Sequence, residues 1–548
     1  MKINSIHIKN FRSLQKLGMD DVGDLVILVG GNSSGKTNII DALTLFFNEL
    51  SPEMQHNIGS IPDYTWFDRE PNSPITFDIT IELNKRDIAI IFSDITETEF
   101  RKEDGNYIRL VRKIEGTPNA AAWSTELLEI NGHLLHGAAT KTNTQEQPAT
   151  TAELTGKILQ NLTTRAKGKF VFLPAGRDTT VSYTGFGPRP TIISTTLIGE
   201  LRTLAQAGGR SEQRKWQRLQ RFVQGVAPSI IDMRVLNGDF NLREHDSGNP
   251  FPVQWVGGGY QEILMLIHQV IKERDAIFGI DEPELHLHPG LARRCLDLLK
   301  DIASQQQLFV TTQSPVFVDR SDLSNVWLIR KSRDSSQITR LQEIEDLGNI
   351  ILELGIRPSD IFYSNIIVFV EGPSDKIVLT ILAHKMGLNF EAGEISLLPT
   401  YGKSQGKYHL DTFIESTKAA NIPFFMILDK GAGRETRKFV NKGILKLDEN
   451  LFLLKKGDIE DYYPRDKVIA TVCSEYNIEL ANEEKQKLEK GSAVESVERL
   501  LKLKKKRMPR GWKTVIGKKV AELMVEDEID EELKRIIERI ARKAGLIV

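Results

Sequence analysis

The segment from Leu25 to Phe47 constrains the fold more than any other part of this chain. An apolar run, LVILV (25–29), leads into the glycine-rich stretch GGNSSGKT (30–37) and then into a helix-like pattern that begins NIIDALTLFF. A strand, a glycine-rich turn and a helix in that order direct backbone N–H groups and a helix N-terminus at one point, which is how phosphates are bound. A chance match in a turn is the alternative, and the flanking strand and helix disfavour it. The segment therefore predicts α/β structure with a nucleotide site.

The residue types in this segment suggest individual roles. Lys36 would reach the β- and γ-phosphates and Thr37 would reach Mg²⁺. A later apolar strand, IFGI, ends in two acids: Asp281 would hold Mg²⁺ through water, and Glu282 would orient and deprotonate the attacking water. The predicted phosphate-binding residues are Gly30, Asn32, Ser33, Ser34, Gly35, Lys36 and Thr37.

Two histidines follow these acids, His286 and His288 in ELHLHP (284–289). They lie two positions apart, without a nearby cysteine to complete a ligand set. Isolated histidine pairs seldom form a metal centre, so we expect them to have no metal role.

A second group of acids follows later strands. IIVFVEGPSD (366–375) places Glu371 at the end of an apolar strand and Asp375 at the start of a helix, and FFMIL (424–428) ends at Asp429. Acids at the carboxyl ends of parallel strands point into one crevice, and oxygen ligands suit Mg²⁺ or Mn²⁺. The alternative is that these are solvated acids capping helices.

Other stretches predict the remaining organisation. ITFDITIEL (75–83) alternates as a half-buried antiparallel strand does, and 176–192, rich in Gly, Pro, Thr and Ser, predicts a loop. Residues 340–362 predict a connecting helix, and the chain from about 483 onward predicts charged helices.

Four motifs together resemble the ABC-type ATPase heads of the RecF/SMC group: IKNFRSL (8–14), the glycine-rich loop, DEPELHLHP (281–289) and TTQSP (311–315). In that group a signature loop from one head completes the ATP site of another, which implies at least a dimer. Gly257-Gly258-Gly259-Tyr260-Gln261 aligns with this loop, with Gly257 where Ser is common, and Gly259 is expected to contact the nucleotide. Gln313 stands where the group usually has a γ-phosphate histidine, and Gln cannot carry charge. We therefore expect ATP binding with slow hydrolysis.

Residues 365–465 resemble a Toprim domain, which supplies a Glu on its first strand and Asp-x-Asp on a later one. Here Gly431 stands at the second Asp. An ABC-type head followed by a Toprim domain resembles the OLD-family nucleases, a wider group that includes Gabija-type and retron-associated defence nucleases. The resemblance implies that GDIEDYYP (457–464) provides Glu460 and Asp461 for a second cation, with Asp458 as an alternative. It also implies a lysine that stabilises charge on the scissile phosphate, mapped to Lys518 with Lys519 as the rival.

The implied fold class is α/β. An ABC-type ATPase domain (1–345) would carry a helical dimerisation insertion at about 190–230, followed by a Rossmann-like Toprim domain (346–480) and a basic helical extension (481–548). The implied catalytic residues are Glu371, Asp375, Asp429, Glu460, Asp461, Lys518 and Glu282. The implied metal ligands are the five acids of the Toprim domain together with Thr37, and the implied cofactors are ATP and two Mg²⁺ or Mn²⁺ ions per Toprim site.

The resemblance implies an ATP-binding, metal-dependent DNA endonuclease or nickase in antiphage defence, using two-metal phosphodiester hydrolysis. Such a protein would form a homo-oligomer and could act with a helicase or with a retron reverse transcriptase and its RNA/DNA. Two alternatives stay open. One is an ATP-dependent sensor or scaffold with a degenerate Toprim domain, and the other is a RecF-like repair ATPase.

Charge and composition bear on partners and compartment. The formal net charge is −2, so a DNA-binding surface must be a local patch. LKLKKKRMPRGWK (501–513) is one candidate, with Trp512 able to stack on a base, and a solvated helical face is the alternative. Only two cysteines, the lack of a signal-peptide pattern and the lack of a long apolar run lead us to expect a cytoplasmic protein without membrane contact.

Overall fold

The computed structural model describes residues 1–48, 50, 55–59, 65–67, 73–93, 106–117, 120–131, 133–134, 149–175, 180–184, 187–191, 195–244, 249–273, 275–332, 335–340, 364–390, 394–400, 422–476, 478–480, 493–503 and 512–547. The chain divides into two compact units, residues 1–342 and 343–548, each described here by itself. The division falls close to the domain boundary predicted near residue 345.

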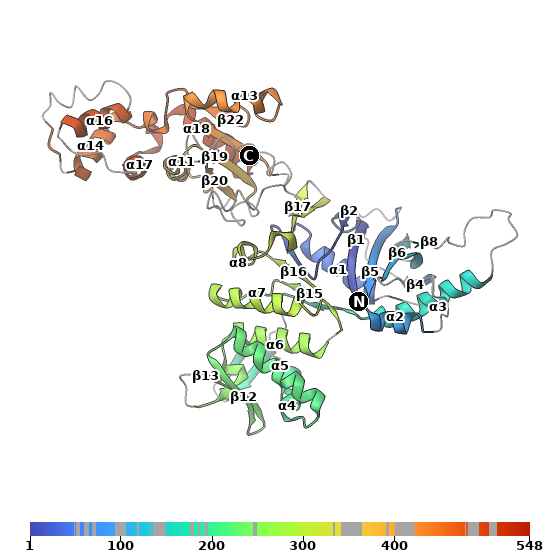
Figure 1. Cartoon of the computed structure of the whole chain (residues 1–548). Coiled ribbons are helices and arrows are strands. Elements are labelled where there is room, and N and C mark those ends of the chain that lie inside the picture. Colours follow the sequence, from blue (N-terminus) through green and yellow to red (C-terminus); the bar gives the residue numbers. More distant parts are fainter. Residues whose placement is uncertain are drawn as a thin grey trace, which may run out of the picture. The chain divides into compact units, whose positions relative to one another are not determined.

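The first unit contains an antiparallel sheet of seven strands, with the order β2-β1-β5-β6-β7-β4 and β8 beside β7 (Figure 1). On β5 alternate side chains are buried, as the sequence alternation predicts. The strands are β1 (Lys2–Phe11), β2 (Leu14–Met19), β4 (Gln55–Gly59), β5 (Ile75–Leu83), β6 (Asn106–Thr117), β7 (Ala120–Ile130) and β8 (His133–Leu134).

A second sheet of six strands has the order β18-β17-β3-β16-β15-β9. Its five strands from β17 to β9 are parallel, and only β18 runs antiparallel to its neighbour. All five residues of β3 are buried, because LVILV lies in the middle of a sheet covered on both faces. The strands are β3 (Leu25–Val29), β9 (Phe170–Leu173), β15 (Ile277–Asp281), β16 (Leu308–Thr312), β17 (Val326–Ser332) and β18 (Ser335–Arg340).

The helix α1 (Lys36–Asn48) joins the two sheets into one core. It buries Ile39, Ile40, Phe46 and Phe47, which belong to a single apolar cluster with residues of β1, β5 and β3. The other helices of this part are α2 (Lys85–Ile91), α3 (Ala149–Ala166), α6 (Gly258–Lys272), α7 (Pro289–Ala303) and α8 (Pro315–Asp319).

The insertion predicted at about 190–230 contains α4 (Thr195–Gln206) and α5 (Arg210–Val226), which pack with a small sheet of β12 (Ile230–Leu236), β13 (Asp239–Glu244) and β14 (Phe251–Pro252) (Figure 1). The loop predicted at 176–192 differs from the structure. It contains a strand pair, β10 (Thr180–Thr184) and β11 (Gly187–Thr191), whose backbone pairing the Gly- and Pro-rich composition does not reveal.

The second unit is built on a parallel sheet with the order β20-β19-β21-β22. The strands are β19 (Ile366–Val370), β20 (Ile395–Pro399), β21 (Phe424–Leu428) and β22 (Leu451–Leu453). The helices are α11 (Pro373–Lys385), α13 (Gly433–Asn441), α14 (Arg465–Tyr476), α16 (Ala493–Leu503), α17 (Trp512–Leu523) and α18 (Glu531–Lys543).

The C-terminal helices share one core with this sheet. Val497 of α16, Val520 of α17 and Ile537 of α18 belong to the same buried cluster as Val368 of β19 and Ile427 of β21. The sequence predicts an extension after residue 480 as a separate part, whereas its apolar faces complete the core of the second unit.

Two predictions fall partly outside the described residues: the connecting helix at 340–362 from residue 341 on, and residues 504–511 of the basic run. No helix in the described ranges is long and apolar enough to cross a membrane.

Candidate functional site

Three neighbouring parallel strands bring the predicted nucleotide residues to one edge of the six-stranded sheet. The glycine-rich loop follows β3, Gln313 follows β16, and Asp281 ends β15. The hydroxyl of Thr37 lies 3.4 Å from a carboxylate oxygen of Asp281, and Thr311 of β16 also donates to Asp281. A hydroxyl and a carboxylate on one side of a phosphate loop are the groups that hold Mg²⁺ beside a nucleotide.

The phosphate loop is already curled around the lysine side chain. Lys36 Nζ donates to the carbonyl oxygens of Gly30 (2.8 Å) and Gly31 (2.9 Å), and its side chain is buried. Burial lowers the pKa of Lys36, although the nearby acids Glu282 and Asp281 counteract it. Gly35 has a φ of +105°, a conformation that disfavours any other residue, so the glycine shapes the turn.

Gln313 lies directly beside the proposed general base. Its side-chain amide donates to Glu282, so Gln313 touches the group expected to activate water. A second acid, Glu284, holds the Gln313 segment by accepting from the Thr312 hydroxyl and from the Gln313 backbone N–H (3.1 Å). Burial raises the pKa of Glu284. The motifs alone assign no role to Glu284, and its position three residues after Asp281 is the signal in the sequence that points to it.

The predicted signature loop forms the start of α6, with Gly257 as the residue that precedes the helix. A side chain at Gly259 would meet Leu287 and Leu291, so the loop lies close against the segment after β15. The Nδ1 atom of His286 forms a hydrogen bond with a carboxylate oxygen of Glu262 of α6 (2.8 Å). The Nδ1 atom of His288 accepts from the backbone N–H of Gly290 and so caps α7. Both histidines therefore have structural partners.

In the second unit, two acids meet at the carboxyl ends of neighbouring strands. Glu371 follows β19 and Asp429 follows β21, and the backbone N–H of Asp429 donates to Glu371 (3.2 Å). The loops after β21 and β22 are joined by the Lys430 N–H and the Gly457 carbonyl (3.5 Å), which brings the 457–461 acids to the same edge.

The acids at this edge are buried close to one another, and this raises the pKa values of two of them. Burial, followed by the charges of Glu371 and Asp458, raises the pKa of Asp429 to about 9. Burial, followed by the charges of Glu460 and Glu371, raises the pKa of Asp375 to about 7. The edge therefore favours bound protons or cations over free carboxylates.

Two of the predicted acids have a second role as helix caps. Asp375 accepts from the Gly372 N–H (2.7 Å) at the start of α11, and Asp461 accepts from the Asp458 N–H (3.3 Å) at a 3₁₀ turn, Ile459–Tyr462. Asp375 still faces the other acids electrostatically. Asp458, the alternative named from sequence, is among the charges that raise the pKa of Asp429.

A lysine that lies in this cluster is Lys513, whereas the assignment of the catalytic role to Lys518 stays a prediction. Lys513 Nζ lies 2.9 Å from Asp458 and 3.4 Å from Glu460. Burial works against its charge, but the Asp458 hydrogen bond and the charge of Glu460 raise the pKa of Lys513. Lys518 is 56% exposed and lies 3.9 Å from Glu522 of its own helix, and Lys519 pairs with Glu475.

The helical period explains this difference. Lys513 and Lys518 are five positions apart, and at 3.6 residues per turn they lie on different faces of α17. Lys513 belongs to the basic run noted in the sequence, but its role depends on which face of α17 meets the acids, and the run itself carries no such signal.

The side chains at this edge are not assembled as a ready-made metal site. Within the described ranges, no three His, Cys, Asp or Glu side chains are placed to hold a metal ion. Glu460 is nevertheless 5% exposed, and its Oε1 accepts no hydrogen bond from the residues that the structure describes. A buried carboxylate oxygen without a donor fits a cation ligand. A side chain at Gly431 would meet nothing within 4 Å.

Comparison with known protein families identifies both domains. Residues 25–319 match the family described as "AAA domain, putative AbiEii toxin, Type IV TA system", and residues 362–430 match "Overcoming lysogenization defect protein-like, TOPRIM domain". The first match spans more than half of the chain. The chain belongs to this AAA-domain family and has the OLD-family architecture, an ATPase domain followed by a Toprim domain. The predicted fold class is thereby confirmed.

Individual relatives extend this comparison. The OLD nuclease of Thermus scotoductus is 22% identical over 480 residues, covering 80% of this chain and 84% of that protein. The Septu protein PtuA of Bacillus thuringiensis is 24% identical over 132 residues, 21% of this chain and 33% of that protein. The SMC head domain from Thermotoga maritima has a TM-score of 0.37 at 16% identity, over 62% of this chain and 99% of that one. The two domains and the OLD nuclease relative support a nuclease-like ATPase.

Proposed function

We propose that this protein is a divalent-metal-dependent DNA endonuclease or nickase controlled by ATP binding. The observation that carries the proposal is the group of acids around Lys513 and Asp429, at the carboxyl edge of the Toprim sheet. Burial and the neighbouring carboxylates raise the pKa values of Asp429 and Asp375, and a divalent cation would stabilise these carboxylates in their charged form.

The donor set fits a hard cation. Glu371, Asp429 and Asp458 offer carboxylate oxygens from three loops at one edge, and Glu460 adds a buried oxygen without a donor. All-oxygen ligation suits Mg²⁺ or Mn²⁺ rather than Zn²⁺. Because no three acidic side chains among the described residues surround one point, we propose that these side chains rotate when cations bind. Two such cations would supply an activated water and stabilisation of the leaving 3′ oxygen.

The protein's own groups then have defined tasks. Asp429 carries a proton at neutral pH beside Glu371, since burial raises the pKa of Asp429 to about 9. Lys513 holds Asp458 and Glu460 in place and can turn its ammonium group toward a phosphate oxygen, because its side chain is 39% exposed. In the first unit, Glu282 and Gln313 would together position water at the γ-phosphate.

Nicking of supercoiled plasmid tests the proposal. The wild type is assayed with Mg²⁺ or Mn²⁺, with and without ATP. Glu371→Ala should abolish nicking and leave nucleotide binding intact, because Glu371 lies only at the Toprim edge. Glu498→Ala, at an exposed position of α16, is the matched control. Nicking by Glu371→Ala at the wild-type rate would show that the catalytic site lies elsewhere.

A second function, without cleavage, is favoured by two features of the Toprim edge. No ligand set is assembled among the described residues, and Gly431 stands at the position of the second Asp. An ATP-dependent sensor or scaffold, or a RecF-like repair ATPase, would bind DNA and ATP without cleaving. No cleavage with any divalent metal, alongside retained DNA binding, would favour it. Similarity to PtuA supports a defence setting for either function.

A further inference from the structure

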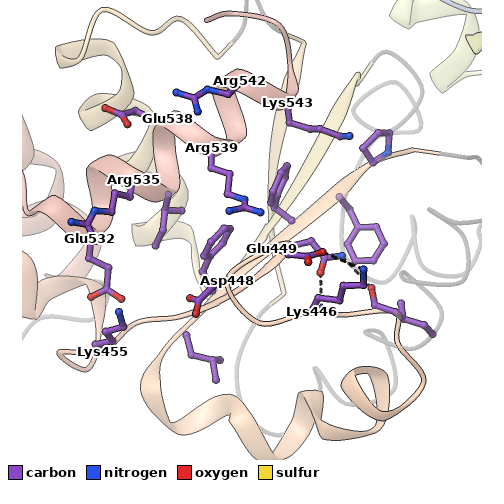
Figure 2. A pocket seen from close by; sticks show the side chains of 18 of the residues that line it. Lys446, Asp448, Glu449, Lys455, Glu532, Arg535, Glu538, Arg539, Arg542 and Lys543 are labelled. Atoms are coloured by element: carbon purple, nitrogen blue, oxygen red, sulfur yellow. Dashed lines mark hydrogen bonds and ion pairs between the residues drawn. The ribbon is translucent and has the colours of Figure 1, made fainter. Parts of the chain in front are cut away.

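A groove of the second unit lies beside the edge strand of the Toprim sheet, and none of the acids just described lines it. It measures about 1240 Å³ and is bounded by the outer face of α18, the loop from Ile444 to Asn450, and the strand β22. Its floor is apolar and includes Phe424, Phe425 and Phe452. We refer to it as the α18 groove (Figure 2).

Basic side chains project into the groove from one stripe of α18. Arg535, Arg539, Arg542 and Lys543 are spaced by four, three and one residues, so they lie on one face of the helix. Figure 2 shows Arg539 reaching from α18 into the space above the loop that carries Lys446 and Glu449. All four are exposed.

Most of the acids that line the groove are already engaged. Glu449 pairs with Lys446 (3.3 Å), Glu531 pairs with Lys534 (3.1 Å), and Glu532 accepts from the Tyr462 hydroxyl (2.7 Å). Of the lining acids, only Asp448 and Glu538 lack a side-chain partner within the described part of the chain.

The lining cations show the opposite balance. Apart from Lys446, the side chains of the lining cations form no ion pair or hydrogen bond with a described residue. These cations are Lys455, Arg535, Arg539, Arg542 and Lys543. Five unpaired cations therefore face two unpaired carboxylates. The groove has an unmet demand for negative charge, although the whole chain is slightly acidic.

One end of the groove, at Lys455, approaches the acids of the Toprim edge. Leu428 of β21 pairs with Leu453 of β22, so Asp429 lies opposite Leu454, the residue before the groove residue Lys455. Neighbouring strands are about 5 Å apart, so Leu454 and Asp429 are separated by about one strand spacing. From Lys455 the groove runs back along β22 to Asn450 and Phe424.

We propose that the α18 groove binds the sugar–phosphate backbone of DNA next to the bond that is cleaved. The inference rests on the proposed function, since it takes the acids at Asp429 as the cleavage site. Arginine and lysine without protein partners bind phosphates at little cost in broken ion pairs. The basic stripe from Arg535 to Lys543 covers about 12 Å of helix, enough for about three or four nucleotides of one strand.

A charge reversal with a matched control tests the groove. Arg539→Glu with Arg542→Glu reverses two charges in it. Arg437→Glu with Lys442→Glu reverses two exposed charges outside it, one on α13 and one directly after this helix; this is the α13 control. DNA binding is measured by fluorescence anisotropy in EDTA at several salt concentrations, with the full chain. We expect the groove variant to bind about 10-fold more weakly. The slope of log K against log salt should fall by about 1.5 if two phosphate contacts are lost.

The outcomes separate the groove from the proposed cleavage. Binding by the groove variant equal to that of the α13 control overturns the groove, even if the wild type nicks plasmid. Weakened binding with a lower salt slope supports the groove, even if the wild type nicks nothing and the cleavage proposal fails. A changed mass of the groove variant by light scattering, with unchanged DNA affinity, would identify a subunit interface and overturn the proposal.

Discussion

At the scale of single residues, two lysines on α17 show how environment decides role. Lys513 lies between Asp458 and Glu460, whereas Lys518 is half exposed and faces Glu522 on its own helix. The two residues have the same chemistry and lie five positions apart. Only Lys513 can influence a group bound at the carboxylate cluster.

Replacing each lysine by alanine should separate these roles. Lys513→Ala should slow nicking by about 100-fold, a typical loss when a charge-stabilising group is removed. It should also lower the free energy of unfolding by about 1 kcal/mol, since a partly exposed ion pair is lost. Lys518→Ala should change stability by less than about 0.5 kcal/mol. Nicking rates and denaturant unfolding measure both, and a larger loss of nicking in Lys518→Ala would favour the assignment from sequence.

The crowded acids predict a pH dependence of stability in the absence of metal. Asp429 and Asp375 have folded-state pKa values of about 9 and about 7, above the value of about 4 for an unfolded Asp. Between these limits the folded state binds more protons than the unfolded state, so stability falls as the pH rises from about 4 to about 9. Thermal unfolding in EDTA should show this fall, and Asp429→Asn should flatten it.

Divalent metal should reverse this dependence, because a cation competes with those protons. Mg²⁺ should raise the unfolding temperature more at pH 8.5 than at pH 5. Asp466→Asn, at an exposed position of α14, serves as the control. An equal slope of unfolding temperature against pH in EDTA for the wild type and Asp429→Asn would show that Asp429 does not hold the proton.

At the scale of elements, Lys513 is held beside the acids because α17 packs closely against α11 and against the turn that carries Tyr463. Tyr463 is 5% exposed, and its hydroxyl has no hydrogen-bond partner among the described residues. A side chain at Gly517 would lie 2.9 Å from that hydroxyl and 3.3 Å from Val378 of α11. Gly517 therefore allows the contact that aims this face of α17 at the acids.

Gly517→Ala should destabilise the protein in one background and stabilise it in another. In the wild type, the added methyl group overpacks a buried site and should cost about 1–2 kcal/mol net of the helix preference for alanine. In Tyr463→Phe the obstructing hydroxyl is gone, so Gly517→Ala should gain up to about 1 kcal/mol. Denaturant unfolding of the four proteins of this cycle measures the coupling. Equal effects in both backgrounds would show that Tyr463 does not set the distance.

At the scale of the whole molecule, two compact units each carry one site and one apolar core. Nucleotide residues lie in residues 1–342, and the carboxylate cluster lies in residues 343–548. Each ligand should therefore stabilise its own unit first.

Ligand-induced stabilisation should separate along this division. At fixed Mg²⁺, ATP at about 100 times its Kd should stabilise the first unit by about 2.7 kcal/mol. Lys36→Ala should remove this shift and leave the effect of Mg²⁺ on the second unit. Asp429→Ala should do the reverse. Calorimetry resolves the two transitions, and loss of the ATP shift in Asp429→Ala would show instead that the two sites are energetically linked.

Much of this architecture could be read from local patterns. The buried strands LVILV, IFGID and IIVFV each end in the residues predicted from their motifs, because a hydrophobic run followed by glycine or acid specifies a strand end locally. The strand pair at 180–191 escaped prediction, since its Gly- and Pro-rich composition is also that of a loop.

Local sequence was enough to predict the two strand-and-loop motifs, the positions of Asp281, Glu371 and Asp429 at strand ends, and the order of the two domains. Those features depend on residues adjacent in the chain. Tertiary structure alone decided that Lys513 rather than Lys518 meets the acids, that Glu284 holds Gln313, and that α18 forms a basic groove beside β22. Each of these depends on which helix face packs against a distant strand, and that choice is made by the burial of the whole core.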